Sequence, residues 1–401
     1  MFSGKTVRLA GELTRERGIL QAAEILRAGG TVAFPTETVY GLGANALDAA
    51  AVRRIFEAKE RPAWDPVIVH VCDQDMLQLV AVVSAEAEVL MEAFWPGPLT
   101  LLLPRTALVP DVVTAGRELV GVRMPAHPVA LELIRAAGVP VAAPSANRFG
   151  RTSPTTAAHV LEDLDGRIGA VLDGGATTVG VESTVLDVGK MTIYRPGAVT
   201  TEMIAAVAGD VTIFQAQAVE LSKPPESLPS PGVGLRHYAP RAKLVLVDVP
   251  IDVDWRHALT PAIERYERAS ELVGLMLPDG WDASRAKPVF EWGPWDDSEI
   301  LARRLFAGLR MLDDAGATVI ICPIPECDGV GVALRDGWRR LLAQSDGGSL
   351  LDPEKSCLMV SGRWWRVDRR RRPGRGCGGG CGEDRSVPGQ DFGRQIRSRR
   401  S

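Results

Sequence analysis

Short apolar runs alternate with helical patterns from the start of the chain to about residue 210, and this alternation constrains the fold more than any other feature. Each run has the length of one strand, and the segments between them carry the three-and-four-residue spacing of amphipathic helices. Such alternation is typical of an α/β layer fold. The expected strands are Thr31–Phe34, Val67–Val71, Leu99–Leu103, Val120–Val122, Val139–Ala143, Ala170–Leu172 and Thr184–Val188.

Glycines and an N-cap mark the helix boundaries in this region. The helical pattern Gly18–Ala28 ends at Gly29, because glycine readily adopts the left-handed conformation that closes a helix. Asp48 is the expected N-cap of a helix that ends at Lys59, since its carboxylate can accept hydrogen bonds from the first free backbone N–H groups. We therefore place one α/β domain at residues 12–210.

A second, smaller α/β unit follows a linker. Prolines punctuate residues 211–241, which end in SPGVGLRHYAP and are typical of an ordered linker. Residues 242–346 lack a glycine-rich phosphate loop, so we expect a Rossmann-like domain without a nucleotide site of its own. Its expected elements are strands Lys243–Val249, Leu272–Leu277 and Thr318–Cys322 and helices Asp297–Ala315 and Gly331–Ala343. Residues 347–401 are rich in Arg and Gly, which predicts a disordered basic tail.

Composition excludes several classes of protein. The chain has 46% hydrophobic residues but no apolar run of the roughly 20 residues that a membrane span needs, and no N-terminal signal-peptide pattern. Its net charge of −4 leaves an acidic body once the arginine-rich tail is set aside, which disfavours a plain RNA-binding module. The cysteines show no metal-ligand spacing, so we expect reduced thiols, a cytoplasmic location and no metal site. They are Cys72, Cys322, Cys327, Cys357, Cys377 and Cys381.

The first polar cluster is FPTETVYGLGANA, residues 34–46, where an apolar run ends in hydroxyl groups, a carboxylate and a tyrosine. Loops at strand ends hold ligands because the strand fixes the loop while the loop presents its side chains. Thr36 and Thr38 are thus candidate ligand contacts, and Gly41 and Gly43 would let the backbone approach a substrate closely. A plain turn in which both threonines bond the backbone explains the cluster equally well.

The second cluster is AKERPAWDPVIVHV, residues 58–71. Lys59 falls at the end of the apolar stripe of its helix, where a charge costs free energy unless an anion meets it. Arg61 follows just after the helix, and two cations that converge in this way suit a polyphosphate. The alternatives are a lysine that reaches solvent and an ordinary surface arginine. His70 lies in the next expected strand, where a structural role is the more common one.

The third cluster is VPVAAPSANRFGRTSPT, residues 139–155, where an apolar run opens into serine, asparagine and arginine. Ser145, Asn147 and Ser153 can bond phosphate or ribose oxygens, and the neighbouring arginines supply positive charge. A nucleophilic Ser145 is the rival interpretation, but its surroundings, PSAN, lack the G-x-S-x-G pattern of a nucleophile elbow.

Three further polar residues lie at the ends of strand-like runs. They are Arg123 in VGVRMP, Ser183 in VESTV and Arg195 in YRPG. Several strand ends that carry cations and hydroxyl groups predict one polar pocket at the rim of a sheet.

Taken together, these segments resemble the YrdC/Sua5 family of threonylcarbamoyl-AMP synthases. The K-x-R and S-x-N signature of that family appears as Lys59-Glu60-Arg61 and Ser145-Ala146-Asn147. PTETVYGLGA, FWPGPLT, VRMP, APSAN, ESTV and RPG occur in the family's order and near its spacing. The linker and the second α/β unit are similar to the longer, two-domain form. The resemblance implies that the first domain is a YrdC-like twisted open sheet.

The resemblance also implies an activity, that of a nucleotidyltransferase. It would form L-threonylcarbamoyladenylate and pyrophosphate from L-threonine, bicarbonate or CO₂, and ATP, with Mg²⁺ carried by the nucleotide. A partner transferase of the TsaD/Kae1 type would then move the threonylcarbamoyl group to an adenosine of tRNAs that read codons beginning with A. A weak tRNA contact by this chain is compatible with that role, and no membrane is involved.

Site residues follow from the positions that match the family motifs. ATP contacts fall on Lys59, Arg61, Asp65, Ser145, Asn147, Ser153, Arg195 and Tyr238, with Lys59 and Arg61 as the catalytic pair. Threonine contacts fall on Thr36, Thr38, His70, Arg123 and Ser183.

Two other functions stay open at this point. A non-enzymatic RNA-binding or translation-associated protein could use the same concave surface, although the acidic body and the threonine-sized polar set count against it. A carbamoyl transferase of metalloenzyme maturation has a similar domain, but it adds zinc-finger and acylphosphatase-like modules that this sequence does not show.

The basic tail is expected to be dispensable. A chain that ends at Ser345 should keep the melting temperature and the activity of the full chain, because an Arg- and Gly-rich segment buries too little apolar surface to stabilise a fold. Calorimetry and enzyme assays of both chains measure this. A loss of several degrees on truncation would show instead that the tail packs on the body.

Overall fold

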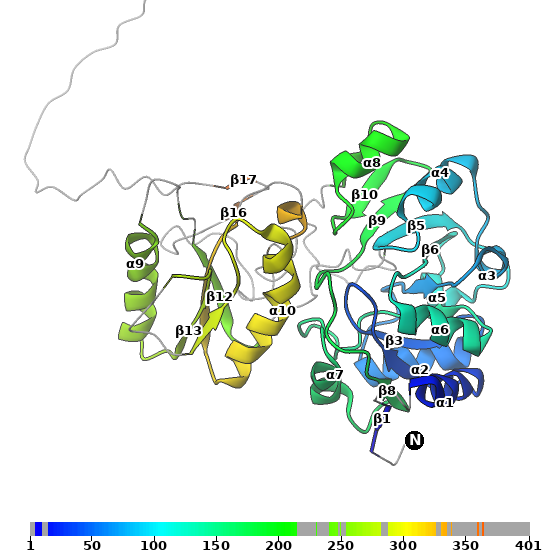
Figure 1. Ribbon diagram of the computed structural model, residues 1–401, viewed down its shortest axis with the longest axis horizontal. Coiled ribbons are helices and arrows are strands. Elements are labelled where there is room, and N and C mark those ends of the chain that lie inside the picture. Colours follow the sequence, from blue (N-terminus) through cyan, green and yellow to red (C-terminus); the bar gives the residue numbers. More distant parts are fainter. Residues whose placement is uncertain are drawn as a thin grey trace, which may run out of the picture. The chain divides into compact units, whose positions relative to one another are not determined.

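The computed structural model describes residues 5–9, 15–214, 230, 240–247, 249, 254–281, 288–325, 330–334, 338, 359–360 and 363–364. Contacts divide the chain into a compact unit, Met1–Trp365, and a second unit, Arg366–Ser401, which lies outside the described residues. Within the compact unit the strands form a large sheet, a small sheet and a separate pair (Figure 1). This mixed architecture confirms the predicted α/β fold class.

The large sheet has eleven strands in the order β1-β8-β2-β3-β7-β4-β6-β5-β9-β10-β11, and it mixes parallel with antiparallel pairs. Its first six strands in sequence are β1 Val7–Leu9, β2 Val32–Phe34, β3 Gly41–Asn45, β4 Ile68–His70, β5 Leu99–Pro104 and β6 Leu119–Arg123. The remaining five are β7 Val141–Ala142, β8 Ala170–Leu172, β9 Thr184–Asp187, β10 Thr192–Arg195 and β11 Thr212–Ile213. Strands far apart in sequence are therefore neighbours, so their ends can meet at one place.

Eight helices of the described chain accompany this sheet. They are α1 Arg15–Arg27, α2 Ala49–Lys59, α3 Gln74–Val80, α4 Ala85–Phe94, α5 Asp111–Thr114, α6 Pro128–Ala137, α7 Ala157–Leu164 and α8 Thr201–Ala208. Helix α1 lies beside α6, and α4 lies beside α8 (Figure 1). Fully buried aliphatic side chains such as Leu26, Leu42 and Leu133 fill the core between helices and sheet, and their burial supplies the main driving force for this fold.

Helix α2 begins where the sequence predicts. The Asp48 carboxylate accepts hydrogen bonds from the backbone N–H groups of Ala50 and Ala51, which confirms it as the N-cap. The helix ends at Lys59, and Glu60 closes it in the left-handed conformation, with φ 56°. Lys59 therefore occupies the last helical position.

Strand β3 is a departure from the sequence prediction, which treats residues 34–46 as a ligand-holding loop. Its residues pair antiparallel with both β2 and β7. A Cβ atom at Gly43 would lie 2.7 Å from the side chains of Phe34 and Val141, so glycine is required there for packing. The expectation that Gly43 admits a substrate is therefore wrong, whereas Gly41 does line the pocket described below.

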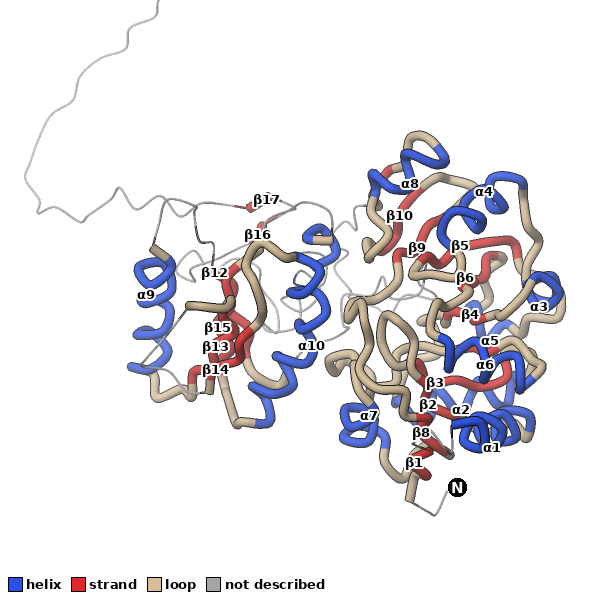
Figure 2. The backbone as a smooth tube through the Cα atoms, in the orientation of Figure 1, coloured by secondary structure: helices blue, strands red, loops and turns tan. Residues whose placement is uncertain are grey.

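The small sheet is entirely parallel, with the order β12-β15-β13-β14. Its elements are β12 Lys243–Val247, α9 Trp255–Arg268, β13 Val273–Leu277, β14 Val289–Glu291, α10 Ser298–Asp314 and β15 Val319–Pro323. Helix α9 covers one face and α10 the other, as Figure 2 shows. Side chains alternate accordingly: Val245 packs with the α9 side, and Leu244 and Leu246 pack with the α10 side.

The rest of the chain is described only in part. A short antiparallel pair, β16 Met359–Val360 and β17 Arg363–Trp364, lies within the expected tail, and the remainder of the tail is outside the described residues. The same holds for most of the expected linker and for the expected helix Gly331–Ala343 beyond Leu334, apart from Trp338.

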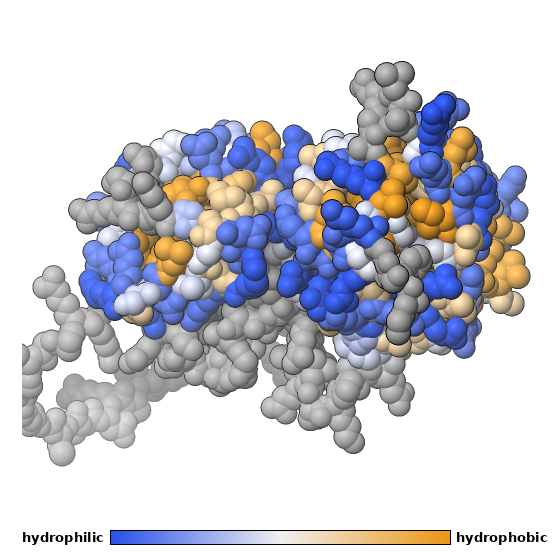
Figure 3. All heavy atoms as spheres, turned by 90° about the horizontal axis from the view of Figure 1, so that it is seen from below, coloured by the Kyte–Doolittle hydropathy of each residue, from blue (hydrophilic) through white to orange (hydrophobic). Residues whose placement is uncertain are grey.

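No helix in the described parts of the chain has the length and apolar character needed to span a bilayer. Figure 3 shows hydrophilic side chains over much of one face, with hydrophobic ones in smaller groups between them. Exposed hydrophobic residues of this scattered kind are normal on protein surfaces.

Trp292 is a central part of the core on the α10 side of the small sheet. It is fully buried, its indole Nε1 donates to the Leu301 carbonyl at 2.7 Å, and its ring meets Trp338 edge-on. Trp292→Ala should lower the free energy of unfolding by about 3–5 kcal/mol, because it removes a large buried side chain. Urea denaturation measures this, with Leu272→Ala at a 44% exposed position as the control. Equal losses for the two variants would contradict the packing role.

Candidate active site

Polar side chains from seven separate segments of the first domain line one pocket. Most of the residues predicted from sequence meet there. The pocket residues from that predicted set are Thr36, Thr38, Arg61, His70, Arg123, Ser145, Ser183 and Arg195. β4, β6 and β10 end, and β9 begins, at the same rim of the sheet, whereas β7 runs antiparallel to β4 and brings Ser145 to the pocket from the side where β4 starts.

His70 and Arg123 lie side by side, because β4 and β6 pair in parallel with these two residues in register. His70 is buried, and the ring of Phe34 meets it edge-on at 6.0 Å between ring centroids. Burial, and then the charge of Arg123, lower the pKa of His70 to about 3, so the imidazole is neutral at physiological pH. Its Nδ1 atom has no hydrogen-bond partner among the described residues, although the ring lines the pocket.

Arg123 is held by the protein before any ligand binds. Its Nε donates to the Gly97 carbonyl at 3.1 Å, its Nη1 donates to the Thr38 hydroxyl at 2.9 Å, and its Nη2 pairs with Glu37 at 2.5 Å. A guanidinium carries five N–H donors, so these three contacts leave donors for a carboxylate in the pocket. The guanidinium is therefore oriented in advance, which is the property of a binding group.

Glu37 is a residue that the sequence reasoning missed. It is 6% exposed, and its carboxylate pairs with Arg123, which is itself 3% exposed. A carboxylate beside a predicted buried strand needs a cation near it. This requirement is the signal in the sequence that could have identified Glu37 as a site residue.

The two threonines of the first cluster satisfy both alternatives considered for them. The Thr36 hydroxyl donates to the Val39 carbonyl at 2.6 Å and accepts from the backbone N–H of Thr38, as a plain turn requires. The Thr38 hydroxyl lies 2.8 Å from that of Thr36 and accepts from Arg123. Both residues also line the pocket, so the turn itself forms part of its wall.

Lys59 occupies a different place from the one that the sequence suggests. Its side chain is buried, and Nζ donates to the carbonyl oxygens of Ser145, at 2.6 Å, and Asn147, and to Asn147 Oδ1 at 3.3 Å. The alternative of a lysine that reaches solvent is wrong, and carbonyl dipoles of the protein take the place of the expected anion. Lys59 is not among the residues that line the pocket. It lies behind them and holds the S-x-N segment from inside the protein.

The charge state of Lys59 follows from its partners. Burial, and then the charge of Arg61, lower the pKa of the amine well below its ordinary value. Three carbonyl acceptors surround Nζ, however, and only the ammonium form has three N–H donors to satisfy them. We therefore assign Lys59 the charged form, which places a positive charge directly behind Ser145.

Arg61 and Asp65 form a buried ion pair at 2.9 Å, and their side chains are 6% and 0% exposed. Arg61 Nη2 also donates to the Pro66 carbonyl at 2.9 Å, so the guanidinium is fixed from two directions. Arg61 lines the pocket, whereas Asp65 is not among the lining residues. Asp65 thus orients Arg61.

Ser183 and Arg195 are both lining residues and are bonded to each other. Arg195 donates from Nε to the Ser183 carbonyl and from Nη2 to the Ser183 hydroxyl, each at 2.9 Å. The Ser183 hydroxyl also lies 2.8 Å from that of Thr100, a residue that sequence reasoning missed. Both Ser183 and Arg195 are buried but line the pocket.

Asn147 and Ser153 support the pocket without lining it. The Asn147 amide donates to the Arg151 carbonyl at 2.6 Å, and the Ser153 hydroxyl donates to Glu182 Oε1 at 2.5 Å. Glu182 lines the pocket and was also missed, although it stands in the ESTV motif. Tyr238 lies outside the described residues.

The pocket is thus lined by three arginines that the protein fixes and by several hydroxyl groups. Arg61 and Arg195 suit phosphate oxygens, and Arg123 beside a neutral His70 suits the carboxylate and amine of an amino acid. Among the described residues no three His, Cys, Asp or Glu side chains come together as metal ligands.

Lys59→Met should lower both stability and activity. The substitution leaves the Ser145 and Asn147 carbonyls without their donor, and a buried acceptor without a partner costs about 1–3 kcal/mol. Chemical denaturation measures the loss, and Lys190→Met, at a side chain 66% exposed, is the matched control. An unfolding curve identical to that of the unmodified chain would contradict the internal role of Lys59.

Two family models match the chain. The model described as "Telomere recombination" matches residues 24–197, and the model described as "Threonylcarbamoyl-AMP synthase, C-terminal domain" matches residues 199–340. Together these matches extend over the small sheet and over the large sheet except β1.

Relatives of similar length support the same assignment. A threonylcarbamoyl-AMP synthase of Pyrococcus abyssi is 44% identical over 332 residues, which cover 82% of this chain and 95% of that protein. One of Bacillus subtilis is 42% identical over 340 residues, which cover 83% and 94%. The crystal structure of P. abyssi Sua5 complexed with L-threonine matches with a TM-score of 0.76 and 42% identity, over 85% of this chain and 97% of that one. The chain belongs to the family of threonylcarbamoyl-AMP synthases.

Proposed function

We propose that the protein forms L-threonylcarbamoyladenylate and pyrophosphate from L-threonine, bicarbonate and ATP. The observation that carries this proposal is a single pocket in which Arg123 and a neutral His70 lie with two further arginines and two serine hydroxyls. Relatives of similar length are named for this product, and one of them was crystallised with L-threonine. Such a pocket can accept a small amino acid and a polyphosphate together.

Threonine is assigned to the part of the pocket around Arg123. The guanidinium would bind the amino-acid carboxylate through the donors that Glu37, Thr38 and Gly97 leave free. The neutral His70 ring can accept a hydrogen bond from the amine, which a protonated ring beside Arg123 would repel. Ser183 and the turn at Thr36 and Thr38 complete this part with hydroxyl groups.

ATP is assigned to the part around Arg61, Ser145 and Arg195. The two arginines bring positive charge to the triphosphate. The Ser145 hydroxyl donates to Asn147 Oδ1, and it would turn away from that oxygen to donate to a phosphate. The other predicted nucleotide residues act from behind this surface or lie outside the described chain: Lys59, Asp65, Asn147 and Ser153 in the first case, Tyr238 in the second.

The reaction would proceed in two steps. The threonine amine and bicarbonate form N-carboxythreonine with loss of one water molecule. A carboxylate oxygen of this carbamate then bonds to the α-phosphorus of ATP, while the bond from that phosphorus to the bridging oxygen breaks and pyrophosphate leaves. Fixed cations would stabilise the charge that develops on the phosphoryl oxygens, and positioning replaces covalent catalysis.

Mg²⁺ fits this scheme as a cation that arrives with ATP, since phosphate oxygens can supply its ligands and it then neutralises phosphate charge. The product is a mixed anhydride, which a second enzyme must use soon after release. We propose a transferase of the TsaD/Kae1 type for that step, with tRNA as the final acceptor, in the cytoplasm.

Pyrophosphate release, with threonine, bicarbonate and ATP each omitted in turn, tests this function. We expect release only with all three present. Arg123→Gln should raise the KM for threonine about 10–100-fold, since a hydrogen bond to a charged group contributes about 1.5–3 kcal/mol, and it should change the KM for ATP far less. Lys190→Gln is the control. Pyrophosphate release that does not depend on threonine would exclude the proposed reaction. A rise in the KM for ATP larger than the rise in the KM for threonine would reassign Arg123 to the nucleotide.

A further inference from the structure

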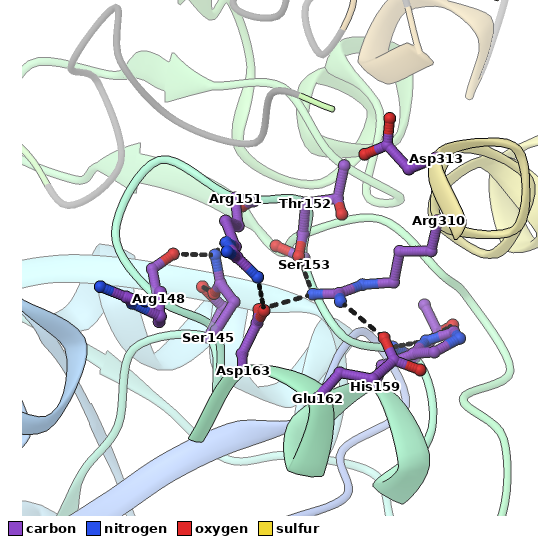
Figure 4. A network of polar contacts seen from close by, with 12 residues as sticks. Ser145, Arg148, Arg151, Thr152, Ser153, His159, Glu162, Asp163, Arg310 and Asp313 are labelled. Atoms are coloured by element: carbon purple, nitrogen blue, oxygen red, sulfur yellow. Dashed lines mark hydrogen bonds and ion pairs between the residues drawn. The ribbon is translucent and has the colours of Figure 1, made fainter. Parts of the chain in front are cut away.

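Arg310 of helix α10 makes its polar contacts with the first domain (Figure 4). Nη2 donates to the Thr152 carbonyl at 2.5 Å and to Asp163 Oδ2 at 2.9 Å, and Nη1 donates to Glu162 Oε2 at 3.1 Å. The residue is only 6% exposed, so its charge is removed from solvent and depends on these partners. An arginine buried in this way holds α10 and α7 in a fixed contact.

Asp163 connects Arg310 to the loop that follows the S-x-N motif. Its side chain is fully buried on α7, and its second oxygen, Oδ1, accepts from Arg151 Nη1 at 2.8 Å. One carboxylate therefore joins an arginine of α10 to an arginine of the loop, as Figure 4 shows. Removal of Arg310 would leave Arg151 as the remaining arginine partner of the Asp163 carboxylate.

The loop in question is Asn147–Ser153, and it reaches the nucleotide part of the pocket from both ends. At its start, Asn147 bonds Lys59 and the Arg151 carbonyl. At its end, the Ser153 hydroxyl donates to Glu182, which lines the pocket. The loop belongs to no helix or strand of the described chain, so these side-chain contacts replace the regular backbone ladder that would otherwise fix its shape.

We propose that Arg310 is a positioning residue for ATP, through which the second domain fixes the loop Asn147–Ser153 behind the nucleotide part of the pocket. This inference rests on the proposed function, because it presumes that ATP binds in the part of the pocket that this loop supports. Arg310 contacts neither the pocket nor the threonine residues, so it should set nucleotide affinity and leave amino-acid affinity unchanged. A residue that only joined the two domains would change stability and leave both affinities as they are.

Steady-state kinetics of Arg310→Gln and Arg310→Lys, below their melting temperatures, test the proposal. We expect the KM for ATP to rise at least about tenfold in Arg310→Gln, as for the loss of a charged hydrogen bond, with the KM for threonine within about twofold. Arg310→Lys should recover part of this loss, because it keeps the charge but not the fork geometry. Arg268→Gln is the control, since it removes an exposed pair with Glu264 within α9.

Hydrogen exchange gives a readout besides activity. The amides of Asn147–Ser153 should exchange faster in Arg310→Gln than in the unmodified chain, while those of α1 should not. Asp163→Asn serves as a second variant should Arg310→Gln fail to fold, and its ATP KM should also rise. In the double variant Asp163→Asn with Arg310→Lys, the fold-increase in the ATP KM should be smaller than the product of the fold-increases in the two single variants.

The outcomes separate this proposal from the function on which it rests. An unmodified chain that releases no pyrophosphate from threonine, bicarbonate and ATP would overturn the proposed function. An active chain whose Arg310 variants keep the ATP KM, or raise the threonine KM equally, would overturn the positioning role alone. A selective rise in the ATP KM with faster exchange in the loop would support it.

Discussion

The rest of the site depends on the hydrogen bonds that the ammonium group of Lys59 donates. It draws the carbonyl oxygens of Ser145 and Asn147 toward one point, although these residues are 86 and 88 positions away in the chain. Helix α2 supplies the lysine, and the segment after β7 supplies the acceptors. Because the group is buried, salt screens this contact much less than it would a contact at the surface. The S-x-N segment is therefore held from within the protein.

From that point outward, the site is a series of charges that are each fixed by a partner. Asp65 fixes Arg61, Glu37 fixes Arg123, and the Ser183 hydroxyl and carbonyl fix Arg195. Prearranged cations need little reorganisation when an anionic substrate binds or when charge develops in a transition state. The large sheet makes this arrangement possible because its mixed strand order brings distant strand ends to one rim.

Sequence patterns predict the architecture well where an apolar run or a cap marks the element. Asp48 and the apolar runs give α2, β5 and β8 nearly to the residue, since local signals determine them. Elements without an apolar run escape this reasoning: β3 contains two glycines and has the composition of a loop, and tertiary packing against Phe34 decides its conformation.

The site was predictable in its residues but not in their roles. The motif positions predict one pocket that contains Arg61, Arg123 and Arg195. In the structure all three residues line one pocket. That Lys59 faces carbonyl groups, and that Glu37 orients Arg123, depend on contacts between segments far apart in sequence, which no local pattern encodes.

The pairing of β1 with β8 has a consequence for synthesis on the ribosome. Val7 lies beside Ala170, so the first strand of the sheet cannot pair until about 160 further residues have been made. At translation rates of about 5–20 residues per second, this delay is roughly 8–30 seconds. During that time β2 also lacks β8 as its neighbour, and its exposed edge can pair with another nascent chain. The order in which the strands are made, and not only their final packing, thus determines when this domain becomes safe from aggregation.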